Sequence, residues 1–205
     1  FGCQMNKHDS ERIAGMLEAL GAVPVGSIEE ADVVAFITCC VREAADTRLY
    51  GQVASLKSLP LRPGTPLAKR LVAVGGCIGQ RDRERLCQEL PHVDAVFGTH
   101  NLGSLPQLLA RAIEQGKAQV EVLEASDSFP TELPSDRERA WAAWLPITIG
   151  CDNFCSYCIV PHVRGREKSR PLEDVVAEAQ GYVDAGVREV TLLGQNVNSY
   201  GRDLY

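Results

Sequence analysis

Three short segments of almost continuously apolar residues constrain what the first half of this chain can fold into. They are ADVVAFIT at 31–38, RLVAVG at 70–75 and DAVF at 94–97. Segments with helical periodicity alternate with them, at 9–20, 41–56, 80–90 and 102–113. Strands that are apolar on both faces are typical of a parallel sheet covered by helices on both sides. Residues 1–116 are therefore predicted to form an open parallel-sheet α/β domain, Rossmann- or flavodoxin-like, whose first strand would precede Phe1.

The rest of the chain changes character twice. Residues 117–143 are rich in Glu, Ser, Asp and Pro and show little periodicity, so we interpret them as an interdomain linker. A strand pattern at 144–150, a helix pattern at 171–185 and a second strand pattern at 187–193 follow. This order predicts that residues 144–205 begin a second parallel α/β domain. Because the chain starts without Met and stops soon after a strand, we expect both natural ends to lie beyond it.

The composition is that of a globular protein with a hydrophobic core, at 45% hydrophobic and 23% charged residues. The sequence has no apolar run that would span a bilayer and no secretory signal, so we expect a cytoplasmic protein without membrane contact. The net charge of -6 gives no overall basic surface for nucleic acid. Any RNA contact must therefore come from a local patch or from a further domain.

Eight cysteines are many for a chain of 205 residues. In a reducing compartment cysteines bind metals or react more often than they pair, although disulfide formation stays open as an alternative. The segment GCDNFCSYCI places Cys151, Cys155 and Cys158 in a C-x3-C-x2-C pattern. Thiolates are soft ligands that suit iron–sulfur clusters or zinc. Three thiolates on a four-iron cluster would leave one iron open to a substrate.

Two other interpretations of this segment stay open. A structural zinc site has four closed ligands, and His162 could supply the fourth. The three cysteines could also be unrelated core residues, because free cysteine is commonly buried.

A second group of cysteines is scattered along the first half of the chain. Cys39 and Cys77 each follow a predicted strand, and Cys3 follows the expected end of the missing first strand. The carboxyl ends of parallel strands meet at one edge of a sheet, which is the usual ligand edge. Three thiolates could therefore converge there as a second metal site. Cys40 is expected to point elsewhere and Cys87 to be a helical core residue, so both are left out.

The C-x3-C-x2-C pattern, with an aromatic residue before its last cysteine, resembles the signature of the radical S-adenosylmethionine (SAM) superfamily. The resemblance implies a 4Fe–4S cluster on Cys151, Cys155 and Cys158 whose open iron binds SAM, and whose electron cleaves SAM to a 5′-deoxyadenosyl radical. It also implies that the second domain is the start of an α/β barrel of partial TIM type. Gly194 and Gln195, which follow the second strand, would contact the methionine part of SAM; a plain turn is the alternative.

Six sequence blocks narrow the resemblance to the methylthiotransferase family, and most closely to its MiaB-type tRNA branch. They are FGCQMNKHDSERI (1–13), ITCCVREA (37–44), VGGCIGQ (74–80), VDAVFGT (93–99), ITIGCDNFCSYCIVPHVRGREKSRP (147–171) and LLGQNVNSY (192–200). The blocks cover nearly the whole chain except residues 117–143, and six blocks in order are far more specific than one. Two positions depart from the family, since Ile37 stands where Asn is usual and Cys40 where Ser is usual. The remaining barrel strands and the C-terminal RNA-binding domain of the family are not in this sequence.

The resemblance implies two 4Fe–4S clusters and SAM as cofactors. The cluster on Cys3, Cys39 and Cys77 would carry the sulfur that a first SAM methylates. A second SAM would give the radical that removes hydrogen from C2 of N6-isopentenyladenosine-37, and the methylthio group would join that carbon. The partners implied are the tRNA anticodon loop, an electron donor and a sulfur donor, and a monomer is favoured.

Three alternatives to this function stay open. A related enzyme would modify threonylcarbamoyl-adenosine-37 of tRNA or an aspartate of a ribosomal protein. A non-catalytic iron–sulfur or zinc module would only scaffold RNA or protein.

A run of basic residues after the last cysteine could hold tRNA phosphates, or could be a solvated loop paired with nearby acids. The run comprises Arg164, Arg166, Lys168 and Arg170.

Overall fold

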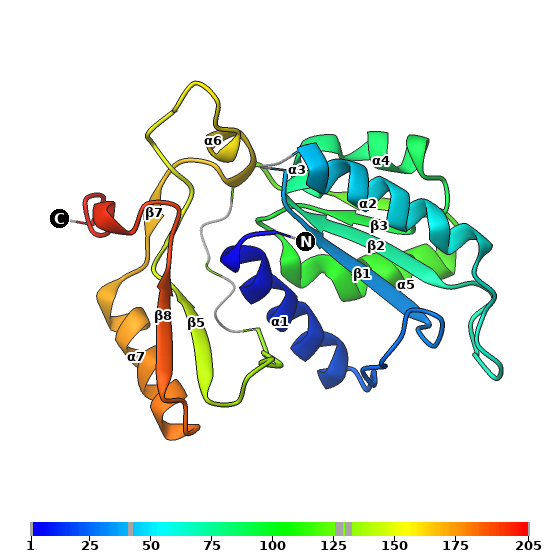
Figure 1. The fold of residues 1–205 in the computed structure, drawn as a ribbon, viewed down its shortest axis with the longest axis horizontal. Helices are drawn as coiled ribbons and strands as arrows, with labels where there is room; N and C mark the ends of the chain where they lie inside the picture. The colour runs from blue at the N-terminus through cyan, green and yellow to red at the C-terminus, as the bar shows by residue number, and fades with distance from the viewer. Residues whose placement is uncertain (1, 41–42, 126–128, 130–132, 205) are drawn as a thin grey trace.

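The computed structural model describes residues 2–40, 43–125, 129 and 133–204. Its larger part is a four-stranded parallel sheet, and its smaller part is a parallel strand pair with one long helix (Figure 1). In the larger part the strands stand in the order β1 (Val33–Thr38), β2 (Leu71–Gly76), β3 (Ala95–Phe97) and β4 (Gln119–Glu121). The predicted parallel α/β architecture is confirmed, and the sequence patterns located the first three of these strands to within two residues.

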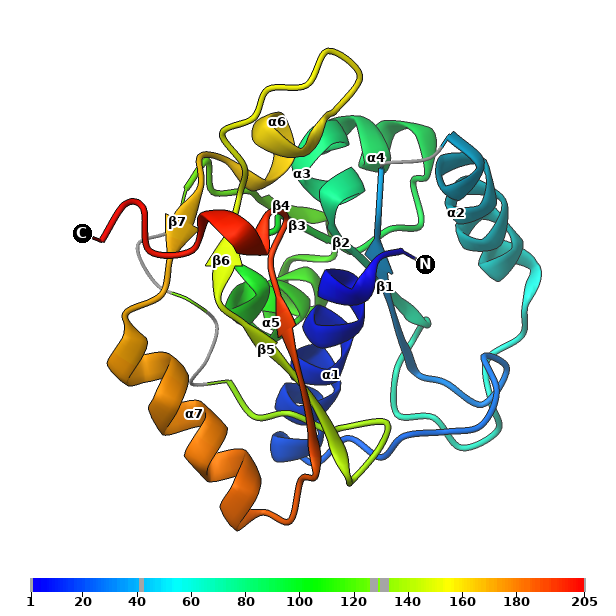
Figure 2. The same ribbon diagram turned by 60° about the vertical axis from the view of Figure 1, so that its left-hand side comes forward.

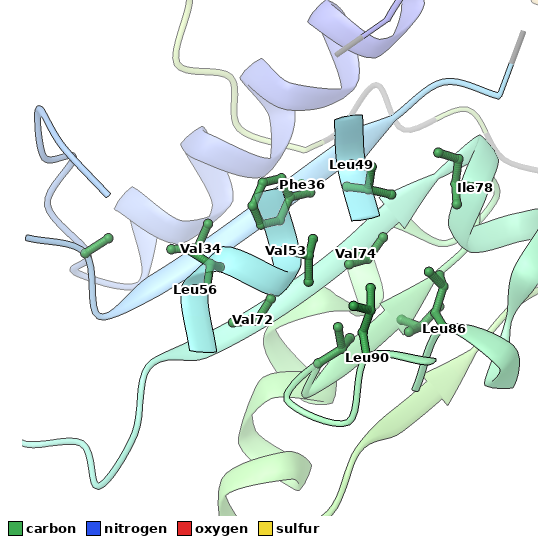
Figure 3. Packing of buried hydrophobic residues seen from close by; sticks show 13 residues of the cluster. Val34, Phe36, Leu49, Val53, Leu56, Val72, Val74, Ile78, Leu86 and Leu90 are labelled. Carbon is green, nitrogen blue, oxygen red and sulfur yellow. The ribbon is translucent and has the colours of Figure 1, made fainter. Parts of the chain in front are cut away.

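Helices cover both faces of this sheet, as strands that are apolar on both sides require. Helices α2 (Glu43–Ser55) and α4 (Glu84–Glu89) pack on one face, where alternate residues of β1 and β2 contribute to the core (Figure 3). That core contains Val34, Phe36, Leu49, Val53, Val72, Val74 and Leu86. Helices α1 (Gln4–Ala19) and α5 (Leu105–Gln115) pack on the other face, against Ile37, Ala73 and Phe97.

One predicted helix is divided in two. The periodicity of residues 80–90 indicated a single helix, but the chain forms α3 (Cys77–Asp82) and α4 with Arg83 between them at a φ of 48°. A positive φ interrupts a helix for any residue that carries a Cβ. The Arg83 guanidinium pairs with Glu124 at 2.5 Å, so a contact from a distant loop accompanies the break.

The segment expected to be a linker contributes a strand. Strand β4 lies inside residues 117–143 and pairs in parallel with β3, so the first structural unit extends beyond residue 116. Further along, the segment runs over α1, where the Asp136 N–H donates to the Glu11 carbonyl at 3.0 Å. Lys7 of α1 also pairs with Glu138 at 2.6 Å. The segment therefore packs against the first unit for part of its length.

The second unit begins with β5 (Ala142–Pro146), which pairs in parallel with β8 (Glu189–Leu193). Helix α7 (Leu172–Asp184) packs on this pair through Val175 and Tyr182, and connects the two strands as the strand–helix–strand order predicted. A shorter antiparallel pair, β6 (Thr148–Ile149) and β7 (Lys168–Ser169), frames the loop that carries the C-x3-C-x2-C pattern. Short 3-10 turns lie at η1 (Leu56–Ser58), η2 (Leu102–Ser104) and η4 (Val197–Ser199).

Helix α1 lies between the two units (Figure 2). The Arg12 side chain extends from α1 to α7, where it pairs with Glu178 at 2.5 Å. Glu178 in turn pairs with Arg170 at 2.7 Å and accepts from the Tyr182 hydroxyl at 2.6 Å. In the part of the chain that the structure describes, none of the helices has the length and apolarity to cross a membrane.

Candidate metal centres

The first cysteine group lies where the carboxyl ends of β1 and β2 meet the start of α1. Cys39 follows β1 directly, Cys77 is the first residue of α3 after β2, and Cys3 precedes α1. The Cys3 thiol donates to the Asn6 side-chain carbonyl at 3.0 Å. Thr38 supports this corner, because its hydroxyl donates to the Gly75 carbonyl at 2.7 Å and accepts from the Ile78 N–H at 3.0 Å.

Gly76 allows this close approach of the strand ends. Its φ is +83°, and a Cβ at this position would lie 2.7 Å from the Thr38 carbonyl oxygen. A side chain would therefore both strain the backbone and separate β1 from β2 beside the cysteines.

Cys40 lies near enough to Cys77 to affect its titration, although we expected its side chain to point elsewhere. The interaction between the two thiols raises the pKa of Cys40 and lowers that of Cys77. Cys87 is half-buried against the hydrophobic core.

Two of these thiols have strongly lowered pKa values. Hydrogen bonding from Cys39 lowers the pKa of Cys3 to about 5 against the opposing effect of burial. Hydrogen bonding from Cys40, helped by the positive charge of Arg164, lowers the pKa of Cys77 to about 6. Thiolates rather than thiols bind metals, so this corner favours the form of cysteine that a metal cluster requires.

A buried ion pair accompanies the lowered pKa values. The Arg164 side chain is 6% exposed and its Nη2 lies 3.2 Å from Asp9 Oδ2 on α1. Burial opposes ionisation of Asp9, but Arg164 and His8 outweigh it and hold the pKa of this carboxyl below its usual range. Arg164 comes from α6 (Val160–Arg164), which packs against α3, so the second unit places a cation beside the cysteines of the first.

The second cysteine group lies on the loop between β6 and α6. Cys151 is buried, Cys158 is half-buried and Cys155 is exposed. The Cys158 N–H donates to the Cys155 carbonyl at 2.9 Å, which folds the C-x2-C part into a tight turn. The Cys151 N–H donates to the Gly165 carbonyl at 3.2 Å, which ties the start of the loop to the end of α6.

Phe154 shapes the exposed side of this loop. It has a φ of 46°, its ring is 52% exposed, and it packs edge-on against His162 with the ring centroids 6.4 Å apart. The Arg166 guanidinium lies 5.5 Å from the centre of the same ring. His162 is therefore engaged with an aromatic ring in the described structure.

Neither cysteine group forms a compact single-ion site. Within residues 2–40, 43–125, 129 and 133–204, no three His, Cys, Asp or Glu side chains are placed so that they could hold a metal ion. In a four-iron cluster each thiolate binds a different iron, so the thiolates need not converge on one point. The donor sets, three thiols on one loop and thiols with lowered pKa at one sheet edge, fit such clusters by their chemistry.

Gly194 and Gln195 follow β8 at the same edge as the C-x3-C-x2-C loop, since β5 and β8 run in parallel. A Cβ on Gly194 would lie 2.2 Å from the Thr148 hydroxyl oxygen, so only glycine allows this approach. The Thr148 hydroxyl and the Gln195 side-chain carbonyl are buried, and each has no hydrogen-bond partner within the described structure. Buried polar atoms are rarely left without partners, so this pair fits a site for a polar ligand.

The four basic residues after the last cysteine lie in different surroundings. Arg164 is buried against Asp9, and Arg170 is 2% exposed and pairs with Glu178. Their guanidinium groups are held inside the protein by carboxylates, so they are not available for RNA phosphates. Arg166 is exposed, although it pairs with Asp152 at 2.8 Å, and Lys168 is half-buried on β7.

Comparisons with known proteins match both units. Residues 1–98 match the model of an uncharacterised protein family, UPF0004, and residues 145–204 match the model of the radical SAM superfamily. Three relatives each bear the name tRNA-2-methylthio-N(6)-dimethylallyladenosine synthase. The relative from Arthrobacter sp. strain FB24 is 55% identical over 98% of this chain and 38% of its own length. That from Streptomyces avermitilis is 53% identical over 100% and 40%, and that from Nocardia farcinica is 54% identical over 98% and 39%.

The chain belongs to the MiaB-type methylthiotransferase family. It spans about two-fifths of the length of these curated relatives. Membership in this family implies 4Fe–4S clusters and SAM as cofactors.

Sequence reasoning missed two polar groups of these candidate sites. Asp9 lies in the block FGCQMNKHDSERI, and Thr148 in the block that contains the C-x3-C-x2-C pattern. The signal for Asp9 was a carboxylate inside a helix stripe that is otherwise buried, next to His8. Nothing in the local sequence distinguished Thr148, whose importance comes from its distance to Gly194.

Proposed function

We propose that this chain is the front part of a radical SAM methylthiotransferase that converts N6-isopentenyladenosine-37 of tRNA to its 2-methylthio derivative. The observation that carries the proposal is the pairing of two cysteine groups, each at the carboxyl edge of a parallel sheet, in a chain whose relatives bear that enzyme's name. Ligand sites lie at this edge in both open α/β sheets and α/β barrels.

We assign Cys151, Cys155 and Cys158 to the 4Fe–4S cluster that supplies the electron for SAM cleavage. Gln195 and Thr148 would offer polar atoms to SAM, and Gly194 keeps the backbone open beside them. Exposed Cys155 lies on the open side of the loop, where a small molecule can reach the metal.

We assign Cys3, Cys39 and Cys77 to the second 4Fe–4S cluster, which would hold the sulfur that is transferred. The lowered pKa values of Cys3 and Cys77 support their role as thiolate ligands. Cys40 lies near Cys77 and contributes to the lowering of its pKa.

The partners of the whole protein follow from the same proposal. They are a tRNA anticodon loop, an electron donor and a sulfur donor, and the protein would act in the cytoplasm as a monomer. Anticodon-loop nucleotides can leave the stack and enter a pocket. Arg166 and Lys168 remain as candidate phosphate contacts beside the C-x3-C-x2-C loop.

The experiment that tests the proposal replaces Cys155 by Ala in the full-length protein, reconstituted without oxygen. Loss of one thiolate from the radical SAM cluster is expected to abolish reductive SAM cleavage while the iron at the other cysteines is retained. Cys87→Ala is the matched control, because Cys87 packs on the core and should leave both iron content and SAM cleavage unchanged.

Three results would overturn parts of this proposal. Zinc in place of iron would indicate a scaffold module. Cleavage of SAM that survives Cys155→Ala would remove the radical role from this loop. A normal level of 2-methylthio-isopentenyladenosine in cells that lack the gene, measured by mass spectrometry of tRNA nucleosides, would assign the enzyme to another substrate.

A further inference from the structure

We propose that Arg164 is a positioning residue for the cysteine cluster of the first unit, although it belongs to the second. Its guanidinium would balance the negative charge of a cluster held by Cys3, Cys39 and Cys77, and would favour the reduced form of that cluster. The inference rests on the proposed function, because it requires a cluster at these cysteines.

The geometry gives Arg164 a defined orientation. It is the last residue of α6, six positions after Cys158, and Gly165 ends the helix with a φ of 74°. Its guanidinium lies inside the protein, held by Asp9 at 3.2 Å, and its helix α6 packs against α3, whose first residue is Cys77. One side chain therefore connects the loop of one cysteine group to the ligands of the other.

The physical argument follows from burial. An arginine remains charged in a protein, and removal of such a charge from water is unfavourable unless opposite charge is nearby. Asp9 supplies one negative charge, and thiolates that hold a cluster at Cys3 and Cys77 would supply more. Reduction of a bound cluster adds one electron and no bond, so the nearby cation stabilises the reduced state more than the oxidised state. Asp9 acts in the opposite direction, because it carries negative charge at a similar place.

The sequence interpretation treated Arg164 either as a contact to RNA phosphates or as part of a solvated loop paired with nearby acids. The buried pairing with Asp9 prevents that role and leaves the charge directed at the cysteines. Arg166, two residues later, is exposed and pairs with Asp152, so the two arginines of the same loop have separate surroundings.

The test is the midpoint potential of the cluster in the first unit, measured by EPR-monitored titration with dithionite in the full-length protein. A Cys155→Ala background removes the signal of the radical SAM cluster. In this background Arg164→Met is expected to make the potential more negative, by about 59 mV for a tenfold change in the ratio of reduced to oxidised cluster. Arg164→Lys should restore at least half of that difference. Arg188→Met, which removes an exposed arginine of the second unit, should leave the potential unchanged.

Asp9→Asn separates a charge effect from a structural one. Removal of this carboxylate is expected to make the potential more positive, opposite in sign to Arg164→Met, whereas a loosened cluster site would move both variants the same way. Equal potentials for the parent and Arg164→Met, or shifts of the same sign in Arg164→Met and Asp9→Asn, would overturn the inference. If Arg164→Met binds no iron, the signs for Arg164→Lys and Asp9→Asn still decide it. Failure of the Cys155→Ala parent to hold a four-iron cluster would instead refute the proposed function.

Discussion

Glu178 joins the two units of the chain, and its replacement by Gln should reveal how much that junction contributes to stability. One carboxylate oxygen accepts hydrogen bonds from Arg12 of α1 at 2.5 Å and from the Tyr182 hydroxyl at 2.6 Å. The other accepts from Arg170 at 2.7 Å. The three charged side chains are 6%, 12% and 2% exposed for Arg12, Glu178 and Arg170 respectively, so solvent screens them little.

The expected cost follows from the charges left behind. Glu178→Gln keeps the shape of the side chain but removes the carboxylate charge that Arg12 and Arg170 share in the described structure. Loss of one member of a buried ion pair costs about 3–5 kcal/mol, because the remaining charge stays buried. Glu173→Gln, on the exposed side of the same helix, is the matched control and should stay within about 0.5 kcal/mol of the parent.

Urea denaturation monitored by Trp fluorescence and by circular dichroism measures this difference. With a slope of about 2–3 kcal/mol per M, the variant's transition should move down by about 1–2 M. Because the lost Arg12–Glu178 pair crosses between the units, the two probes should also separate in the variant. A midpoint for Glu178→Gln that coincides with that of Glu173→Gln would refute the reasoning, since it would mean that the network is solvated or replaceable.

Two further predictions concern the ligand edges. Gly194→Ala should destabilise the protein by about 1–3 kcal/mol and weaken SAM binding in equilibrium dialysis, because its Cβ would meet Thr148 at 2.2 Å. Gly181→Ala, which meets nothing within 4 Å on α7, is the control and should gain about 0.5–1 kcal/mol; equal effects would contradict the clash. Burial, aided by Arg164, lowers the pKa of His100 below its ordinary range. Folding therefore favours the neutral imidazole. Its contribution to the free energy of unfolding is fully present above the unfolded pKa of about 6.5 and is lost as the pH falls. His100→Asn should thus reduce the acid-side decline in unfolding free energy between about pH 7 and pH 5; an unchanged decline would show that His100 does not titrate with folding.

The sheet was predictable from sequence because its strands are buried on both faces. A run such as ADVVAFIT has no polar face to offer water, so it fits only the middle of a covered sheet. The position of Cys39 and Cys77 at one edge of the sheet was predictable for a related reason, since the ends of parallel strands share an edge whatever their distance in sequence. Strand β4 was missed because its three residues, QVE, are too few to show a hydrophobic pattern, and all three are half-buried.

The surroundings of the basic residues were not predictable in the same way. Arg164, Arg166 and Arg170 stand in one short run, but two of them point into the protein and one into solvent. Their partners, Asp9 and Glu178, lie on helices far away in the sequence. The local sequence shows that a side chain is charged, but it does not show which distant carboxylate will pair with it inside the protein.

Two buried arginines that reach across between the units, Arg12 and Arg164, also show what holds the two cysteine groups relative to each other. Arg12 extends from the first unit into the second, and Arg164 extends from the second into the first. Each ends at a buried carboxylate on a helix of the other unit, and breaking either pair leaves a charge away from water at a cost of about 3–5 kcal/mol. Two such contacts in opposite directions resist separation of the units more strongly than the covalent connection between β4 and β5 alone. The spacing between the two cysteine groups is therefore a property of the packed interface around α1, and the identities of Arg12 and Arg164 matter to it as much as those of the cysteines.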